Sequence, residues 1–209
     1  MKPATAAIAA LMIMQMSTSQ AMPLEPTVRD GALAGDALSS PFASTLRPDD
    51  CLIVVDAATQ RLSLWQGGQQ VCAFPVSTGA AGLGCEENSG KTPTGWHRVA
   101  EWIGRDAAPG QVFVSRVPTD EVVPPSNWRS ETDDDKVLTC IMWLEGLEPG
   151  RNSGPGIDSH DRFIYIHGTS QEQLLGTPAS HGCIRLSNRD AAELFHRTYG
   201  HETLCLITE

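Results

Sequence analysis

The chain has 209 residues, of which 41% are hydrophobic, so it is large enough for one domain with a core and is not expected to be disordered throughout. Its formal net charge is −10 with only 15 Lys and Arg residues, which argues against a protein that binds nucleic acid through the phosphate backbone. The 14 Pro and 19 Gly residues indicate many turns, as in a strand-rich fold.

Residues 1–21 have the pattern of a secretory signal peptide. Lys2 gives a short positive region, an apolar run covers residues 4–14, and small residues precede the expected cleavage site. The run is shorter than the roughly 20 residues that a membrane span needs, so we expect no integral span after signal removal. The expected location is therefore the periplasm or cell envelope. The alternative is a frayed, alanine-rich N-terminus on a cytoplasmic protein.

The next segment, residues 22–48, is rich in Pro, Ala, Ser, Gly and Asp without clear periodicity. We expect a linker or a loosely ordered lead-in there. A single folded domain is expected to cover residues 49–209. It begins with CLIVVD (51–56), which has the pattern of a buried strand, and the alternating RLSLW (61–65) predicts its hairpin partner.

Further strands are predicted along the rest of the domain. Residues 70–79 form one of them, and Pro75 indicates an edge or bulge position within it. The remaining strands are predicted at residues 111–117, 136–144, 163–166 and 202–208.

One segment has the pattern of a helix. Ser187 is a suitable N-cap, apolar residues recur at helical spacing from Ala191 to Thr198, and Gly200 follows the last turn. The sequence therefore predicts a mainly β fold, with β-sandwich-like mixed sheets and one short helix directly after the HGC stretch at 181–183.

The segment NSGKTPTG (88–95) contains a Gly-Lys-Thr triplet that is typical of phosphate-binding loops. That motif requires a glycine where Cys85 stands, and it requires a helix to begin where Pro93 forms a turn. We therefore expect no bound nucleotide.

A zinc site is a second possible interpretation of the histidines and of Cys183. His181 and Cys183 are two positions apart, and neither they nor His160 and His167 have the spacing of a common zinc site. We expect neither a metal nor an organic cofactor.

Six cysteines are spread along the chain without any C-x-x-C pair: Cys51, Cys72, Cys85, Cys140, Cys183 and Cys205. In an exported protein an even number of cysteines suggests disulfides. If Cys183 stays free, one or two bridges are expected among the four cysteines in predicted strands. Strand cysteines also serve as small apolar fillers, which is the competing interpretation.

The HGC stretch has three interpretations: a metal site, a structural thiol or a nucleophile. A thiol attacks as its thiolate, and its free pKa is about 8.5. The helix expected near Ser187, together with the imidazoles of His167 and His181, would lower that pKa. Gly182 would allow a sharp turn, and the amides of Gly182 and Cys183 would form an oxyanion hole.

A second motif supports the nucleophile. IYIHGT (164–169) is an apolar strand that leads into His167 and then a glycine. A histidine at the end of a strand is well placed to act as a general base. The alternative is a core histidine whose hydrogen bonds are satisfied.

IYIHGT (164–169) followed by SHGCIRLSN (180–188) resembles the L,D-transpeptidase catalytic domain, also called the YkuD-like family. VDAATQRLSLW (55–65), FPVSTG, KTPTG and LEGLEPGRN occur in the order that the family shows. The resemblance covers roughly residues 50–209 and implies a β-sandwich-like fold that acts on bacterial peptidoglycan.

The resemblance also implies roles for individual residues. Cys183 would be the nucleophile, and His167, oriented by the Gly168 carbonyl, would be the general base and later the acid. His181 and Gly182 would shape the oxyanion site together with the Cys183 amide.

Three further residues complete the comparison with the family. Ser180 matches the Ser or Thr that precedes His-Gly-Cys. Arg185 would either support the site or meet a substrate carboxylate. His160 stands where an aromatic residue is usual, so no role is assigned to it.

The implied reaction begins with attack on the carbonyl that joins the third residue of a stem tetrapeptide to its terminal D-Ala. D-Ala leaves and a thioester remains. The acyl group then passes to an amine of another stem or to a lysine of an outer-membrane lipoprotein. Water as acceptor would give an L,D-carboxypeptidase or related hydrolase. A cell-wall-binding module without catalysis is a further alternative.

Overall fold

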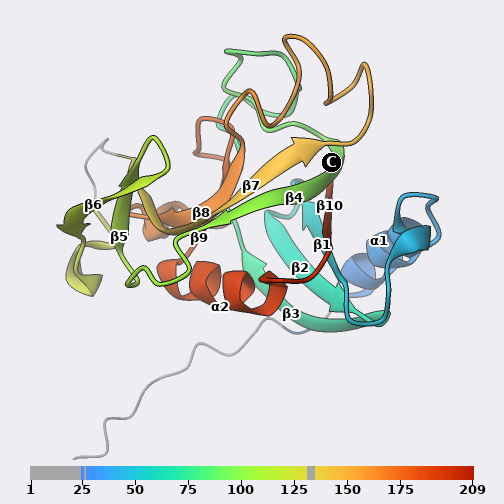
Figure 1. Cartoon of the computed structure of the whole chain (residues 1–209), viewed down its shortest axis with the longest axis horizontal. Coiled ribbons are helices and arrows are strands. Elements are labelled where there is room, and N and C mark those ends of the chain that lie inside the picture. The colour runs from blue at the N-terminus through green and yellow to red at the C-terminus, as the bar shows by residue number, and fades with distance from the viewer. Residues whose placement is uncertain (1–24, 26, 131–134) are drawn as a thin grey trace, which may run out of the picture.

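The computed structural model describes residues 25, 27–130 and 135–209 (Figure 1). The predicted signal peptide, residues 1–21, lies outside the described residues. Within the described part of the chain, no helix has both the length and the apolar composition that a membrane span requires.

The strands of the described residues form one mixed sheet, which confirms the predicted mainly β class. They are β1 (Cys51–Asp56), β2 (Arg61–Gln66), β3 (Gln69–Pro75), β4 (Gly95–Ile103), β5 (Gln111–Val114), β6 (Val117–Val122), β7 (Val137–Gly146), β8 (Tyr165–Thr169), β9 (Ile184–Leu186) and β10 (Thr203–Thr208). Their order is β3-β2-β1-β10-β4-β7-β5-β6, and β8 pairs with both β7 and β9. Among the paired strands of the described residues, β1–β10 and β8–β9 are parallel and the other pairs are antiparallel.

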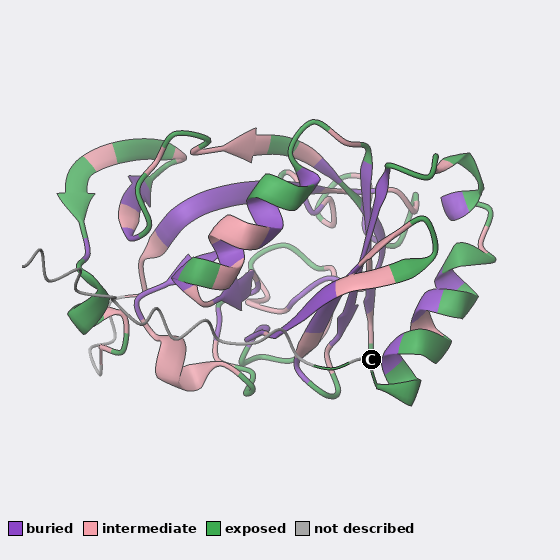
Figure 2. Cartoon of the chain, turned by 90° about the horizontal axis from the view of Figure 1, so that it is seen from below, coloured by how far each residue is buried: buried purple, intermediate pink, exposed green. Residues whose placement is uncertain are grey.

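The sheet curls over itself, so that its two halves enclose the main core. Side chains of β1, β2, β3 and β10 meet those of β7, β8 and β9 there, and α2 (Asn188–Thr198) closes the side (Figure 2). This arrangement is sandwich-like, as predicted. The predicted helix is confirmed as α2. As predicted, Ser187 caps it, since its hydroxyl accepts a hydrogen bond from the Asp190 amide at 3.1 Å.

The strand prediction at residues 111–117 was wrong, and strand β4 was missed, each for an identifiable reason. Residues 111–117 are not one strand, because Ser115 and Arg116 both have positive φ and form the turn of the β5–β6 hairpin. Strand β4 was not predicted at all. A register shift between Val99 and Glu101 interrupts the alternation of apolar residues that marks a strand.

The predicted disulfides are also absent, since all six cysteines are free thiols. Cys51, Cys72, Cys140 and Cys205 lie in the main core, where they fill space between apolar neighbours. Burial raises the pKa of both Cys72 and Cys140 to about 12, which keeps these thiols protonated and inert. The competing interpretation, that strand cysteines are apolar fillers, describes them correctly.

The expectation of a linker or loosely ordered lead-in was wrong for residues 28–38, which form helix α1 (Val28–Leu38). Thr27 caps this helix in a reciprocal capping box with Asp30. Ala34 and Ala37 pack in a second apolar cluster with side chains of β1, β4 and β10, on the face of the sheet opposite the main core. The buried contacts of this helix are made mainly by small alanines, which allow a close approach to the sheet.

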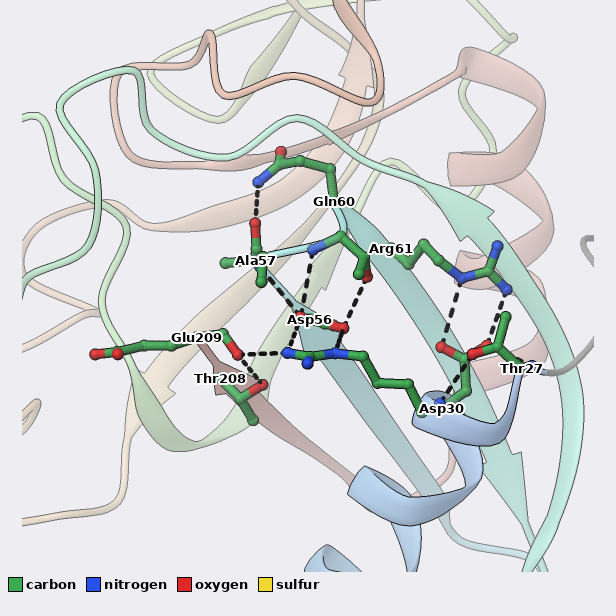
Figure 3. A network of polar contacts seen from close by, with 11 residues as sticks. Thr27, Asp30, Asp56, Ala57, Gln60, Arg61, Thr208 and Glu209 are labelled. Carbon is green, nitrogen blue, oxygen red and sulfur yellow. Dashed lines mark hydrogen bonds and ion pairs between the residues drawn. The ribbon is translucent and has the colours of Figure 1, made fainter.

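Polar contacts fix α1 to the edge of the domain (Figure 3). Arg61 of β2 donates to Asp30 at 2.9 Å. Arg29 pairs with Asp56 at the end of β1 and also donates to the Glu209 carbonyl oxygen at 2.9 Å. Burial opposes the ionisation of Asp30 and Asp56, but hydrogen bonds from Arg61 and Arg29 hold the pKa of each below its ordinary value.

Replacing Ala34 by glutamate is expected to lower the free energy of unfolding by about 2–4 kcal/mol, because a carboxylate would enter the apolar contact between α1 and the sheet. Ala32→Glu makes the same chemical change on the exposed side of the same helix. It is expected to alter stability by less than about 0.5 kcal/mol. Urea titration of both variants measures the difference. Equal losses would show that this contact does not hold α1.

Candidate active site

The two sequence motifs meet where β8 and β9 pair in parallel. His167 lies in register with Arg185, and Cys183 directly precedes β9. Because alternate residues of a strand point to the same face, Cys183 and Arg185 share a face with Tyr165 and His167. Cys183 accordingly packs against the cluster that contains Tyr165, while the intervening residues of both strands face the main core.

His167 is held as a neutral imidazole. Its side chain is buried, and Nδ1 lies 2.7 Å from the Gly168 carbonyl oxygen. A carbonyl only accepts, so Nδ1 carries the proton and Nε2 keeps a lone pair. Burial is the main cause that lowers the pKa of His167 below 6.5. The predicted contact between His167 and the Gly168 carbonyl is present.

Gly168 has no room for a side chain. A Cβ atom there would lie 2.4 Å from Asn188 Oδ1 and 3.0 Å from the Leu138 carbonyl oxygen. Asn188 is itself fixed, since it accepts from the Thr139 hydroxyl at 2.6 Å and donates to the Thr169 carbonyl at 2.8 Å. This buried network supports the C-terminal half of β8, directly after His167.

The Cys183 sulfur lies between two backbone groups. It accepts from the Tyr165 amide at 3.4 Å and donates to the Phe163 carbonyl oxygen at 3.5 Å. Burial raises the pKa of Cys183 to about 11; the Tyr165 amide opposes this effect, and the negative charge of Asp135 adds to it. Cys183 is therefore a thiol at neutral pH.

The predicted lowering of the Cys183 pKa was wrong for two physical reasons. Helix α2 begins only at Asn188, beyond β9, and packs against β7 and β8 from the main-core side. The imidazole of His167 is neutral and brings no positive charge. The resting pair is thus a thiol and a neutral imidazole.

Hydrogen bonds of the Ser180 side chain stabilise the turn before Cys183. The Ser180 hydroxyl accepts from the Gly182 amide at 3.0 Å and donates to the Cys183 carbonyl oxygen at 2.6 Å. Gly182 has φ of +123°, and a Cβ atom there would lie 3.0 Å from the Lys91 carbonyl oxygen. The Gly182 amide is thus already engaged by Ser180, contrary to the predicted oxyanion contact.

Arg185 lies beneath the site rather than on its surface. Its side chain is 1% exposed, donates to Gln171 Oε1 at 2.9 Å and forms an ion pair with Asp135. Of its two predicted roles, the geometry favours support of the site over contact with a substrate carboxylate. His181, by contrast, is 87% exposed, and its Nδ1 lies 3.5 Å from Asp135 Oδ2.

Several residues at the site were missed by sequence reasoning. Asp135 belongs to no motif and precedes β7. Trp143 stacks on His160 with ring centroids 3.8 Å apart. The Arg116 guanidinium, at the tip of the β5–β6 hairpin, lies over the Trp143 ring at 4.6 Å and donates to the Tyr165 hydroxyl at 3.3 Å.

The described residues contain no group of three His, Cys, Asp or Glu side chains placed to hold a metal ion. The chemistry that the arrangement itself offers is nucleophilic. A thiol and an imidazole with a free Nε2 lone pair share one face of two paired strands.

The sequence of residues 51–203 matches the family model YkuD, described as the L,D-transpeptidase catalytic domain. No curated protein matches the chain.

Solved structures with a similar fold include three L,D-transpeptidases. L,D-transpeptidase 3 from Mycobacterium tuberculosis is 16% identical with a TM-score of 0.46, over 77% of this chain and 61% of that one. An enzyme from Mycobacterium smegmatis is 19% identical with a TM-score of 0.43, over 77% and 59%. A domain from Xylanimonas cellulosilytica is 19% identical with a TM-score of 0.44, over 87% and 70%. The chain thus spans less than two thirds of the length of the two mycobacterial structures.

Proposed function

The chain belongs to the YkuD family of L,D-transpeptidase catalytic domains, and we propose from this that it is an exported enzyme that transfers acyl groups between peptidoglycan stem peptides. The observation that carries the proposal is the placement of Cys183 and His167 on one face of β8 and β9, with the imidazole held by Gly168. The proposed domain is residues 49–209, and the proposed location is the periplasm or cell envelope, where the wall lies.

In the first half of the reaction, Cys183 attacks the carbonyl between the third stem residue and the terminal D-Ala. Because the resting thiol is protonated, its proton passes to His167 Nε2 as the carbon–sulfur bond forms. The tetrahedral oxyanion requires donors. With the Gly182 amide held by Ser180, the Cys183 amide and the His181 side chain are the proposed ones.

Collapse of the tetrahedral intermediate breaks the amide bond. His167 returns its proton to the departing nitrogen, D-Ala leaves, and a thioester remains on Cys183. In the second half, His167 takes a proton from the acceptor nucleophile, which attacks the thioester and restores the thiol. The residues required are those of the chain itself, and no step of this scheme calls on a cofactor.

The acceptor determines the product. An amine on a second stem gives a cross-link between third residues, and a lysine of an outer-membrane lipoprotein gives anchoring to the wall. Water gives L,D-carboxypeptidase activity. We propose the stem amine as the principal acceptor, because the family to which the chain belongs is named for transpeptidation.

Mass spectrometry of muropeptides incubated with the purified protein tests this function. Dimers joined through third residues, with loss of D-Ala, are expected. Tripeptides alone would identify a hydrolase, and unchanged tetrapeptides would contradict both. N-terminal sequencing of the native protein tests export, since cleavage is expected near Met22.

A further inference from the structure

A carboxylate lies next to the Cys183 face and has no part in the reaction as written so far. Asp135, in the segment before β7, is 18% exposed and forms an ion pair with the buried Arg185. The same oxygen, Oδ2, lies 3.5 Å from His181 Nδ1. Asp135 therefore joins the guanidinium beneath the site to the exposed imidazole beside Cys183.

The ion pair leaves two buried polar atoms without partners. Among the described residues, neither Asp135 Oδ1 nor Arg185 Nε has a hydrogen-bond partner. A carboxylate that is mostly shielded from water and hydrogen-bonded at only one oxygen is less well screened than one in bulk water. Its charge therefore acts on the neighbouring titratable groups rather than being fully screened.

The charged and titratable groups around Cys183 come from every element packed against it. They are Arg185 of β9, His181 of the preceding turn, His167 and Tyr165 of β8, Arg162 before β8, Arg116 of the β5–β6 hairpin, and Asp135. Glu101 acts on Tyr165, and Asp135 is the carboxylate whose charge acts on both Cys183 and His167 among the described residues. Its charge raises the pKa of Cys183 and of His167, whereas Arg185 and Arg162 lower the pKa of Cys183.

We propose that Asp135, anchored by Arg185, is a positioning residue whose negative charge adds to the effect of burial in keeping Cys183 protonated at rest, and stabilises the His167 imidazolium once the thiol proton has moved to Nε2. This inference rests on the proposed function for its meaning in catalysis. The charge delays thiolate formation until a substrate carbonyl is in place. It also protects the thiol, because the thiolate is the form that reacts with alkylating and oxidising agents.

Asp135→Asn tests the proposal through the pH dependence of Cys183 alkylation. Loss of the negative charge lowers the pKa of Cys183, so the alkylation midpoint with iodoacetamide moves to lower pH. At pH 8, each unit of this shift raises the alkylation rate about threefold, because a tenfold gain in thiolate is partly offset by lower nucleophilicity. Peptide mapping assigns the label to Cys183, and Asp135→Glu, which keeps the charge, is expected to restore the midpoint.

Arg185→Gln shows whether the alkylation rate changes because a charge is lost or because the substitution makes Cys183 more accessible to the reagent. Removing the guanidinium takes away a charge that lowers the pKa of Cys183, so alkylation becomes slower than in the wild type. Opening the site would instead accelerate alkylation in both variants. Opposite changes in Asp135→Asn and Arg185→Gln support the proposal. An unchanged midpoint in Asp135→Asn, or acceleration in both variants, overturns it.

A second readout uses acylation of Cys183 by a carbapenem. In Asp135→Asn the acidic limb of the rate profile is expected at lower pH, because the His167 imidazolium loses its stabilising carboxylate. A lower rate without displacement of this limb would assign Asp135 a structural role only. Both readouts are independent of wall substrates. An unreactive muropeptide assay would therefore refute the proposed function while leaving the alkylation result to decide the role of Asp135.

Discussion

Replacing Cys183 by alanine is expected to reduce acyl transfer by about 10⁴-fold or more, to the level without enzyme, because no other group forms the thioester. The same variant is expected to form no covalent adduct with a carbapenem, whose strained amide carbonyl accepts attack by the thiol. Intact-protein mass spectrometry measures the adduct, and muropeptide turnover measures the transfer.

Cys85→Ala is the matched control for this substitution. Cys85 is the other partly exposed thiol, and its sulfur lies 3.9 Å from the Thr94 carbonyl oxygen in the loop before β4. Full activity and a normal adduct are expected in this variant. A carbapenem adduct on Cys85, together with an active Cys183→Ala protein, would refute the nucleophile.

Replacing His167 by alanine is expected to slow acylation about 100-fold or more, the usual scale for loss of a general base. The effect is large here because the raised pKa of Cys183, about 11, leaves almost no thiolate at neutral pH. Without Nε2 the thiol proton has no acceptor. The rate of carbapenem adduct formation, followed by stopped flow, measures the loss.

The pH dependence of the wild type provides a further check on His167. Burial lowers the pKa of this residue, so the base stays neutral below pH 6.5, and acylation is lost only as the pH falls through the lowered value. His196→Ala, an exposed histidine near the end of α2, serves as control and should leave the profile unchanged. An acidic limb that survives in His167→Ala would show that another group accepts the proton.

The local sequence pattern was sufficient to predict those parts of the fold and site that depend on residues close together in the sequence. The β1–β2 hairpin follows from its alternating residues, and α2 follows from its cap at Ser187. The proximity of Cys183 and His167 was predicted from two motifs, and the pairing of β8 with β9 places both residues on one face of the sheet.

The remaining features depend on the tertiary environment. Desolvation and the charge of Asp135, which is distant in sequence, raise the pKa of Cys183. The local motifs therefore predicted a pKa shift in the wrong direction. The burial of Arg185 likewise depends on Gln171 and Asp135, which come from other segments. Helix α1 was missed because its apolar stripe, Leu33, Ala34 and Ala37, consists mostly of small residues in a segment rich in Gly and Asp.

The position of β10 has a consequence for how the protein folds. This strand is the last of the sheet in chain order, yet it lies between β1 and β4 and pairs in parallel with β1 from Cys51 opposite Thr203 (Figure 1). Closing so long a loop carries a high entropic cost and makes folding slow. A chain synthesised from its N-terminus cannot join the two halves of the sheet until β10 has emerged.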